Sequence, residues 1–182
     1  MSFCGIDFSL TSPAITILGD DDKFENAKVY FLTDIKKFTG TFQNVTGLSH
    51  KSFSHPIQRY KHIVDTLLNV AQLTSSDIVY LEDYSMGSKG KVFHIAEATC
   101  ILKYRLYESG IKYITVPPTV VKKQFTNRGN SDKNMMYQSF LEKTNVDLIS
   151  QMHYTKNKIE SPISDIVDSY SLSWMAYNNE RI

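Results

Sequence analysis

The stretch "GIDFSL" at residues 5–10 decides the fold, because it contains a carboxylate where a buried strand normally has apolar side chains only. It lies within residues 2–10, an apolar run that predicts a β-strand interrupted by a single acid, Asp7. A charged side chain is almost never found in a protein core unless it is paired or holds a metal. Asp7 is therefore the first candidate for a functional residue.

The composition is that of an ordinary globular protein. We expect a single domain over residues 1–182, since the chain has no repeat, no low-complexity tract and no linker-like segment. No window approaches the roughly 20 apolar residues of a membrane span, and no basic segment precedes the first apolar run. Cys4 and Cys100 lie far apart and are expected to be reduced and buried. These features predict a cytoplasmic protein of a bacterial or virus-infected cell, with nucleus and organelle left open.

The first strand is followed by two more, over 14–19 and 28–33, joined by short polar turns that favour an antiparallel meander. Residues 36–55 have no clear periodicity and are predicted to be irregular. Apolar spacing and turn residues then predict the remaining elements: helix 56–73, strand 77–82, helix 92–109, strand 112–117, helix 118–125, helix 131–143 with Ser131 as N-cap, and helix 162–177. The sequence predicts an α/β fold: a mixed five-stranded sheet, three antiparallel strands then two parallel, flanked by helices.

Four acids stand in apolar surroundings on three different predicted elements. Asp7 lies in the first strand, Glu82 ends the strand 77–82, and Asp165 and Asp168 are three residues apart in the last helix, on one face. If these carboxylates meet, they must either become protonated or bind divalent cations. Oxygen ligands select Mg²⁺ or Mn²⁺ over Zn²⁺, and two such ions about 4 Å apart promote phosphodiester hydrolysis. Taken singly, Asp165 could also be an acid of the first helical turn that is stabilised by the helix dipole, and Glu82 could pair with a lysine.

Basic residues are segregated along the chain although the net charge is only +1. The stretches 35–64 and 109–131 contain lysine and arginine but no acid, which predicts either a phosphate-binding face or solvated loops. Three aromatic residues of the first stretch, Phe38, Phe42 and Phe53, would either stack on unpaired bases or anchor a long loop to the core.

Four segments together resemble the RuvC family of Holliday junction resolvases, which belongs to the ribonuclease H-like superfamily. The segments are "GIDFSL" (5–10), "VYLEDYS" (79–85), "VPPTVVKKQFTNRGNSDKNMMYQSF" (116–140) and "SDIVDSYSLS" (164–173). The third segment is the most discriminating, since its proline, Val-Lys pair, glycine-containing loop and helix-starting lysine occur in the family's order. Residues 20–75 match only as generic strands, loop and helix.

The resemblance implies a ribonuclease H-like fold and a homodimeric, metal-dependent endonuclease that resolves four-way DNA junctions by symmetric nicking. It implies two Mg²⁺ ions per active site, replaceable by Mn²⁺, held by Asp7, Glu82, Asp165 and Asp168. Lys133 would join these acids as a catalytic residue. The resemblance also places Lys122 near the scissile phosphate, and we expect Lys123, Arg128, Lys89 and Lys91 to bind DNA as well. Tyr84 would either act as a wedge between bases or pack in the core under its loop.

Alternatives to this interpretation remain open. The protein could be a nuclease of the same fold that acts on other branched DNA or on RNA–DNA hybrids, or a non-catalytic module that binds junctions. The predicted helix 92–109 contains small and apolar residues that suit either a dimer interface or an internal core: Ala96, Ala98, Cys100, Ile101 and Leu102.

Overall fold

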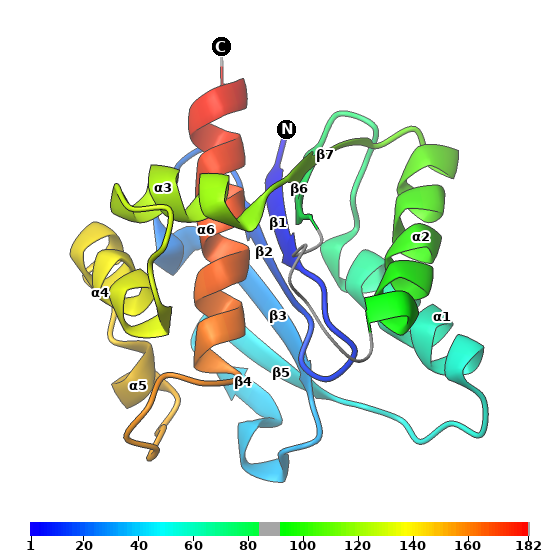
Figure 1. Ribbon diagram of the computed structural model, residues 1–182, viewed down its shortest axis with the longest axis horizontal. Helices are drawn as coiled ribbons and strands as arrows, with labels where there is room; N and C mark the ends of the chain where they lie inside the picture. Colours follow the sequence, from blue (N-terminus) through cyan, green and yellow to red (C-terminus); the bar gives the residue numbers. More distant parts are fainter. Residues whose placement is uncertain (84–91, 182) are drawn as a thin grey trace.

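The computed structural model describes residues 1–83 and 92–181 and contains a seven-stranded sheet with helices on both faces (Figure 1). The strands are β1 Phe3–Asp7, β2 Ala14–Leu18, β3 Lys28–Thr33, β4 Gly40–Phe42, β5 Val45–Ser49, β6 Ile78–Glu82 and β7 Lys112–Val116. The α-helices are α1 Pro56–Ala71, α2 Val92–Glu108, α3 Pro118–Thr126, α4 Lys133–Thr144, α5 Leu148–Gln151 and α6 Ile163–Glu180. Two short 3₁₀ turns, Phe24–Asn26 and Lys36–Phe38, precede β3 and β4.

Strand β1 lies inside the sheet, in the order β4-β5-β3-β2-β1-β6-β7. It pairs antiparallel with β2 and parallel with β6, while β2–β3 is antiparallel and β6–β7 is parallel. The predicted α/β class and the predicted sequence of three antiparallel strands followed by two parallel ones are therefore confirmed. Because β1 has strands on both sides and helices on both faces, its residues are apolar up to Asp7 at its end.

The predicted strand count of five was wrong, because β4 and β5 lie in the stretch 36–55 that was predicted to be irregular. Strand β5 pairs parallel with β3, and β4 pairs antiparallel with β5. Gly47 weakens the strand pattern in the sequence, yet no other residue fits: a Cβ there would lie 1.9 Å from the Phe38 carbonyl oxygen. Phe38 is fully buried, so it anchors this segment to the core and is not available to stack on bases.

The two faces of the sheet are covered in different ways. On one face, α6 with α3 and α4 encloses a core that includes Phe3, Phe31 and Tyr170. On the other face, α1 and α2 pack on a second core that includes Ile6 and Leu67. Figure 1 shows α6 running across the sheet with α3 and α4 beside it, and α1 with α2 on the other side.

Two smaller predictions were also corrected. Helix α4 is capped by Asp132, whose carboxylate accepts a hydrogen bond from the Met135 amide at 2.8 Å. Ser131 is instead buried, and its hydroxyl donates to the Arg128 carbonyl, which closes the preceding loop. Cys4 is buried as expected, but Cys100 is exposed because it lies on the outer face of α2.

Helix α2 contributes to the protein's own core. Ala98 and Leu102 are fully buried there, so the internal-core interpretation holds for these two residues. Among the helices of the described residues, none combines the length and apolar character that crossing a membrane requires.

Candidate active site

Two of the four predicted acids end adjacent parallel strands. Asp7 is the last residue of β1 and Glu82 the last of β6, and the register pairs Ile6 with Leu81 one step earlier. Ile6 and Leu81 both face the core beneath α1 and α2. Since side chains alternate along a strand, Asp7 and Glu82 both project toward the opposite face, the one covered by α6.

Helix α6 reaches these strand ends because β1 has a glycine at the crossing. A Cβ at Gly5 would lie 2.1 Å from the Ser169 carbonyl oxygen and 2.3 Å from the Ser173 amide nitrogen. Only glycine lets the backbones of helix and strand approach this closely. The sequence "GID" thus combines the residue that admits the helix with the acid that faces its first turns.

The four carboxylates interact electrostatically. Burial, followed by repulsion from Asp168, Asp165 and Glu82, raises the pKa of Asp7 well above its ordinary value. Burial and the neighbouring Glu82 and Asp165 raise the pKa of Asp168 to about 7. Burial also raises the pKa of Glu82. The structure therefore brings all four predicted acids to one place, where their negative charges oppose one another.

Asp165 has a serine hydroxyl on one of its two oxygens. The residue is 9% exposed, and its Oδ1 accepts a hydrogen bond from Ser164 Oγ at 3.1 Å. Burial raises the pKa of Asp165, and the hydroxyls of Ser12, Ser161 and Ser164 partly offset that rise. Its Oδ2 is buried without a hydrogen-bond partner in the described residues. A buried carboxylate oxygen with no donor is costly unless a ligand supplies the missing contact.

Two lysines from separate helices complete the site. Lys133, the first residue of α4, donates from Nζ to Ser164 Oγ at 3.2 Å, and Lys122 of α3 lowers the pKa of Glu82 electrostatically. A cavity of about 260 Å³ is lined by Glu82, Asp168, Lys122 and Lys133 among others. Two carboxylates and two lysines therefore line one cavity at the C-terminal ends of β1 and β6.

The donor set fits a hard divalent cation. Its ligating atoms are carboxylate oxygens, their mutual repulsion would fall on binding a cation, and Asp165 Oδ2 lacks a partner. Within residues 1–83 and 92–181, no three His, Cys, Asp or Glu side chains are close enough to form a complete metal cage. Mg²⁺ does not require one, because one or two carboxylates with waters and substrate phosphates are its usual ligands.

Two of the other predicted DNA-binding residues fall outside this cavity. Lys123 of α3 and Arg128 of the following loop are exposed and do not line it. Tyr84, Lys89 and Lys91 lie outside the described residues.

Sequence reasoning missed the serines that surround Asp165 and the reason for Gly5. Ser12 lies in the turn after β1, and its hydroxyl is 3.0 Å from that of Ser161, although 149 positions separate them along the chain. The serine-rich stretch "SPISD" at 161–165 was the available signal, since serines next to a buried acid are candidate hydrogen-bond donors.

Comparisons with known proteins agree with this architecture. No family model and no curated protein matches the sequence. A structure of Thermus thermophilus RuvC matches with a TM-score of 0.58 at 15% identity, covering 99% of this chain and 96% of that one. T. thermophilus RuvC in complex with a Holliday junction substrate matches with a TM-score of 0.62 at 14% identity, with the same coverage. The yeast mitochondrial Holliday junction resolvase Ydc2 matches with a TM-score of 0.54 at 14% identity, covering 96% of this chain and 78% of that one. The chain therefore has the ribonuclease H-like fold of the RuvC resolvases.

Proposed function

We propose that this protein is a crossover junction endodeoxyribonuclease, which resolves four-way DNA junctions by divalent-metal-dependent hydrolysis of phosphodiester bonds. The observation that carries the proposal is the cavity where Glu82 and Asp168 face Lys122 and Lys133, on a RuvC fold. Two free cysteines and no disulfide in the described residues suit a reducing compartment, such as the cytoplasm of a bacterium or of a virus-infected cell.

The acids Asp7, Glu82, Asp165 and Asp168 would hold two Mg²⁺ ions, with Mn²⁺ as a substitute. Bound there, the ions would supply Lewis acidity for the attacking water and for the departing 3′ oxygen. The protein's own part is to hold the carboxylates ready. Gly5 sets the distance between α6 and β1, and Ser164 fixes one oxygen of Asp165 so that the other remains available.

Lysines at the cavity rim would bind the phosphate that is cut. Lys133 is exposed, and its hydrogen bond to Ser164 holds its ammonium group beside the carboxylates. Among the described residues it forms no direct salt bridge with any of them. Lys122 also lines the cavity and lies close enough to Glu82 to lower the pKa of that carboxyl. Lys123 and Arg128 would follow the DNA backbone away from the site, and each phosphate contact adds salt-dependent affinity.

We further propose that two copies of the chain pair through the outer face of α2. Paired nicks in a two-fold symmetric junction require two active sites, which a symmetric dimer supplies. The outer face of α2 exposes three large side chains: Phe93 (82% exposed), Tyr104 (58%) and Tyr107 (77%). Exposed aromatic side chains in one patch are typical of protein interfaces.

The dimer can be tested by sedimentation velocity. Tyr104→Glu combined with Tyr107→Glu should yield a monomer, because it places two like charges at the centre of the symmetric contact. Ile57→Glu is the matched control, since it changes an exposed apolar residue (48% exposed) on α1, outside this face. A dimer that persists in the double variant, or a wild type that is monomeric, contradicts the assignment.

Cleavage can be tested with a synthetic four-way junction in the presence of Mg²⁺. We expect symmetric paired nicks with 5′-phosphate and 3′-hydroxyl ends. Asp7→Asn or Glu82→Gln should slow cleavage by about a thousandfold or more, because each removes a ligand charge from the metal site. Junction binding should survive in both variants. Asp20→Asn, in an exposed turn, is the matched control and should cut normally.

The same assay decides between the alternatives. Flaps, forks and RNA–DNA hybrids are compared with the junction at equal concentration, and faster cleavage of any of these replaces the junction as substrate. Undiminished cutting by both carboxylate variants contradicts the catalytic assignment. If calorimetric titration detects no Mg²⁺ or Mn²⁺ binding while junction binding persists, the protein is a non-catalytic binding module.

A further inference from the structure

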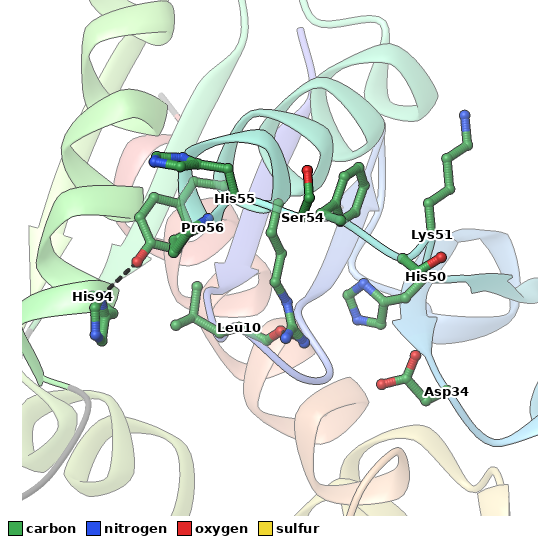
Figure 2. A pocket seen from close by; sticks show the side chains of 12 residues that line it. Leu10, Asp34, His50, Lys51, Ser54, His55, Pro56 and His94 are labelled. Carbon is green, nitrogen blue, oxygen red and sulfur yellow. Dashed lines mark hydrogen bonds between the residues drawn. The ribbon is translucent and has the colours of Figure 1, made fainter.

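A larger pocket lies on the other side of the loop that follows Asp7. Its volume is about 590 Å³, within the range of about 300–1,000 Å³ usual for small-molecule sites. Its walls come from residues 50–55 before α1, the first turns of α1 and the start of α2, together with Leu10 of the loop between β1 and β2 and Asp34 after β3. Figure 2 shows His50 and Asp34 on one side of this pocket and His94 on the other, with the start of α1 between them. We call it the His50–His94 pocket.

The pocket wall holds the loop between β1 and β2 through two backbone carbonyls. Arg59 donates from Nη2 to the Leu10 carbonyl at 2.5 Å, and His50 Nε2 donates to the Thr11 carbonyl at 2.8 Å. The hydroxyl of the next residue, Ser12, lies 3.0 Å from that of Ser161, and both hydroxyls lower the pKa of Asp165. One short loop therefore touches the carboxylates on one side and the His50–His94 pocket on the other.

The pocket contains positive charge that is not neutralised. In the part of the chain that the structure describes, neither Lys51 nor Arg59 forms a salt bridge, and Asp34 is the single carboxylate lining the pocket. Lys51 is exposed, and Arg59 keeps N–H groups beyond the one given to Leu10. His50 Nδ1 is buried without a partner. Planar guanidinium and ammonium groups of this kind bind phosphate oxygens well.

The histidines of the pocket are partly occupied by contacts within the protein. His50, His55 and His94 all line the pocket. His55 caps α1 by accepting from the Ile57 amide, and His94 Nδ1 lies 2.7 Å from the Tyr60 hydroxyl. One ring nitrogen of each of these two histidines therefore has a protein partner, and the cations Lys51 and Arg59 in the same lining favour an anion as the ligand.

We propose that the His50–His94 pocket binds a DNA phosphate flanking the one that is cut, with its nucleoside against the apolar side chains of Leu10 and Phe53. The assignment rests on the proposed nuclease function and extends it, because it adds a second phosphate subsite across the loop from the carboxylates. It also gives the basic segment 35–64 a function that the catalytic cavity does not explain. A DNA strand bound both at the carboxylates and in the His50–His94 pocket would be held on both sides of the loop 8–13.

The test measures binding in the cleavage-inactive Asp7→Asn background by fluorescence anisotropy over a salt series. Lys51→Met should weaken junction binding about tenfold and reduce the salt slope by about 1, because it removes one phosphate contact. The matched control is Lys28→Met. Lys28 is exposed at the start of β3, which runs parallel to β1. Asp7 is at the end of β1, so the two residues lie at opposite ends of the strands.

A second measurement identifies the phosphate. Junctions are made in which a neutral methylphosphonate replaces a single phosphate at successive positions. At one position next to the cut site, this replacement should weaken binding by the wild type. In Lys51→Met the same replacement should have no effect, since the lysine that would contact this phosphate is absent. Arg59→Lys should weaken the same contact, because lysine keeps the positive charge but lacks the paired N–H groups of the guanidinium.

Each outcome decides the matter. If Lys51→Met binds like Lys28→Met, or if no methylphosphonate position couples to Lys51, the pocket assignment is overturned while the nuclease function stands. If no DNA of any shape binds, both fail together. If thymidine monophosphate alone protects the pocket histidines in NMR titration while the methylphosphonate scan is flat, the pocket holds a free nucleotide and the DNA assignment is overturned.

Discussion

The two faces of the sheet bury similar helices but use different chemistry to do so. On the α6 face, the helix backbone rests directly on β1 at Gly5, and serines bond across the contact: Ser173 Oγ donates to the Phe3 carbonyl at 2.6 Å, and Ser169 Oγ lies 2.8 Å from Thr16 Oγ1. On the α1–α2 face, branched and long apolar side chains fill the space, with Ile6 and Leu67 fully buried.

The difference follows from what each face has to hold. Carboxylates that bind a common ligand need positions fixed to within about 0.5 Å, and direct backbone contact with hydrogen bonds supplies such precision. An apolar interface tolerates small readjustments of its side chains. We therefore expect the face that holds the acids to be the more rigid one, and substitutions at Gly5, Asp168 and Ser173 test this comparison.

The largest effect is expected from Gly5→Ala. The added Cβ would lie 2.1 Å from the Ser169 carbonyl oxygen, so α6 and β1 must separate. We expect a loss of about 3 kcal/mol or more in the free energy of unfolding, measured by urea denaturation. Ile6→Val, on the same strand but facing α1 and α2, should cost only about 1 kcal/mol. Equal losses in the two variants would remove the distinction between the faces.

An intermediate effect is expected from pH, because Asp168 has a pKa of about 7 in the folded protein and 3.8 as its ordinary value. The folded state therefore binds this proton more tightly than the unfolded state does. Its contribution to stability is complete below about pH 4, falls as the pH rises toward 7, and is gone above that. In metal-free buffer, thermal unfolding should show this decline for the wild type and a weaker one for Asp168→Asn.

Divalent ions should reverse that decline, since a ligand that binds only the folded state stabilises it. Adding Mg²⁺ at pH 8 should raise the unfolding temperature of the wild type more than that of Asp168→Asn. Asp147 provides the opposite sign: hydrogen bonds from Ser150 and Tyr137 lower its pKa, so its stabilising contribution is lost as the pH falls. A wild-type stability that rises from pH 4 to 7 would contradict the repulsive cluster.

The smallest effect is expected from Ser173→Ala. It removes the hydrogen bond to the Phe3 carbonyl across the helix–strand contact and should cost about 1 kcal/mol. Ser171 is the matched control, because its hydroxyl donates only to the Asp168 carbonyl within α6. Ser171→Ala should change the free energy of unfolding by no more than about 0.5 kcal/mol. Alanine has a higher helix propensity than serine, and a serine hydroxyl bonded to the preceding turn does not stabilise a helix. Chemical denaturation of both variants gives the comparison directly.

Local patterns were sufficient to predict most of the architecture. The meander, the parallel pair and the helices that cover them follow from periodicity and turn residues, and the acids were found because a charge in an apolar strand needs a reason. Strands β4 and β5 escaped notice because β4 has only three residues and Gly47 breaks the apolar alternation of β5. The reason for Gly47, the Phe38 carbonyl behind it, is a contact that no local pattern records.

The sequence by itself determined which residues are candidates for the chemistry, since four carboxylates in apolar settings and a lysine at a helix start are visible as residue types and spacings. Only the tertiary structure decided their geometry: that Gly5 admits α6, that Ser12 and Ser161 meet beside Asp165, and that a second cationic pocket backs onto the same loop. These contacts join residues up to about 170 positions apart. Local preferences act over a few residues, whereas such contacts form only when the whole chain packs.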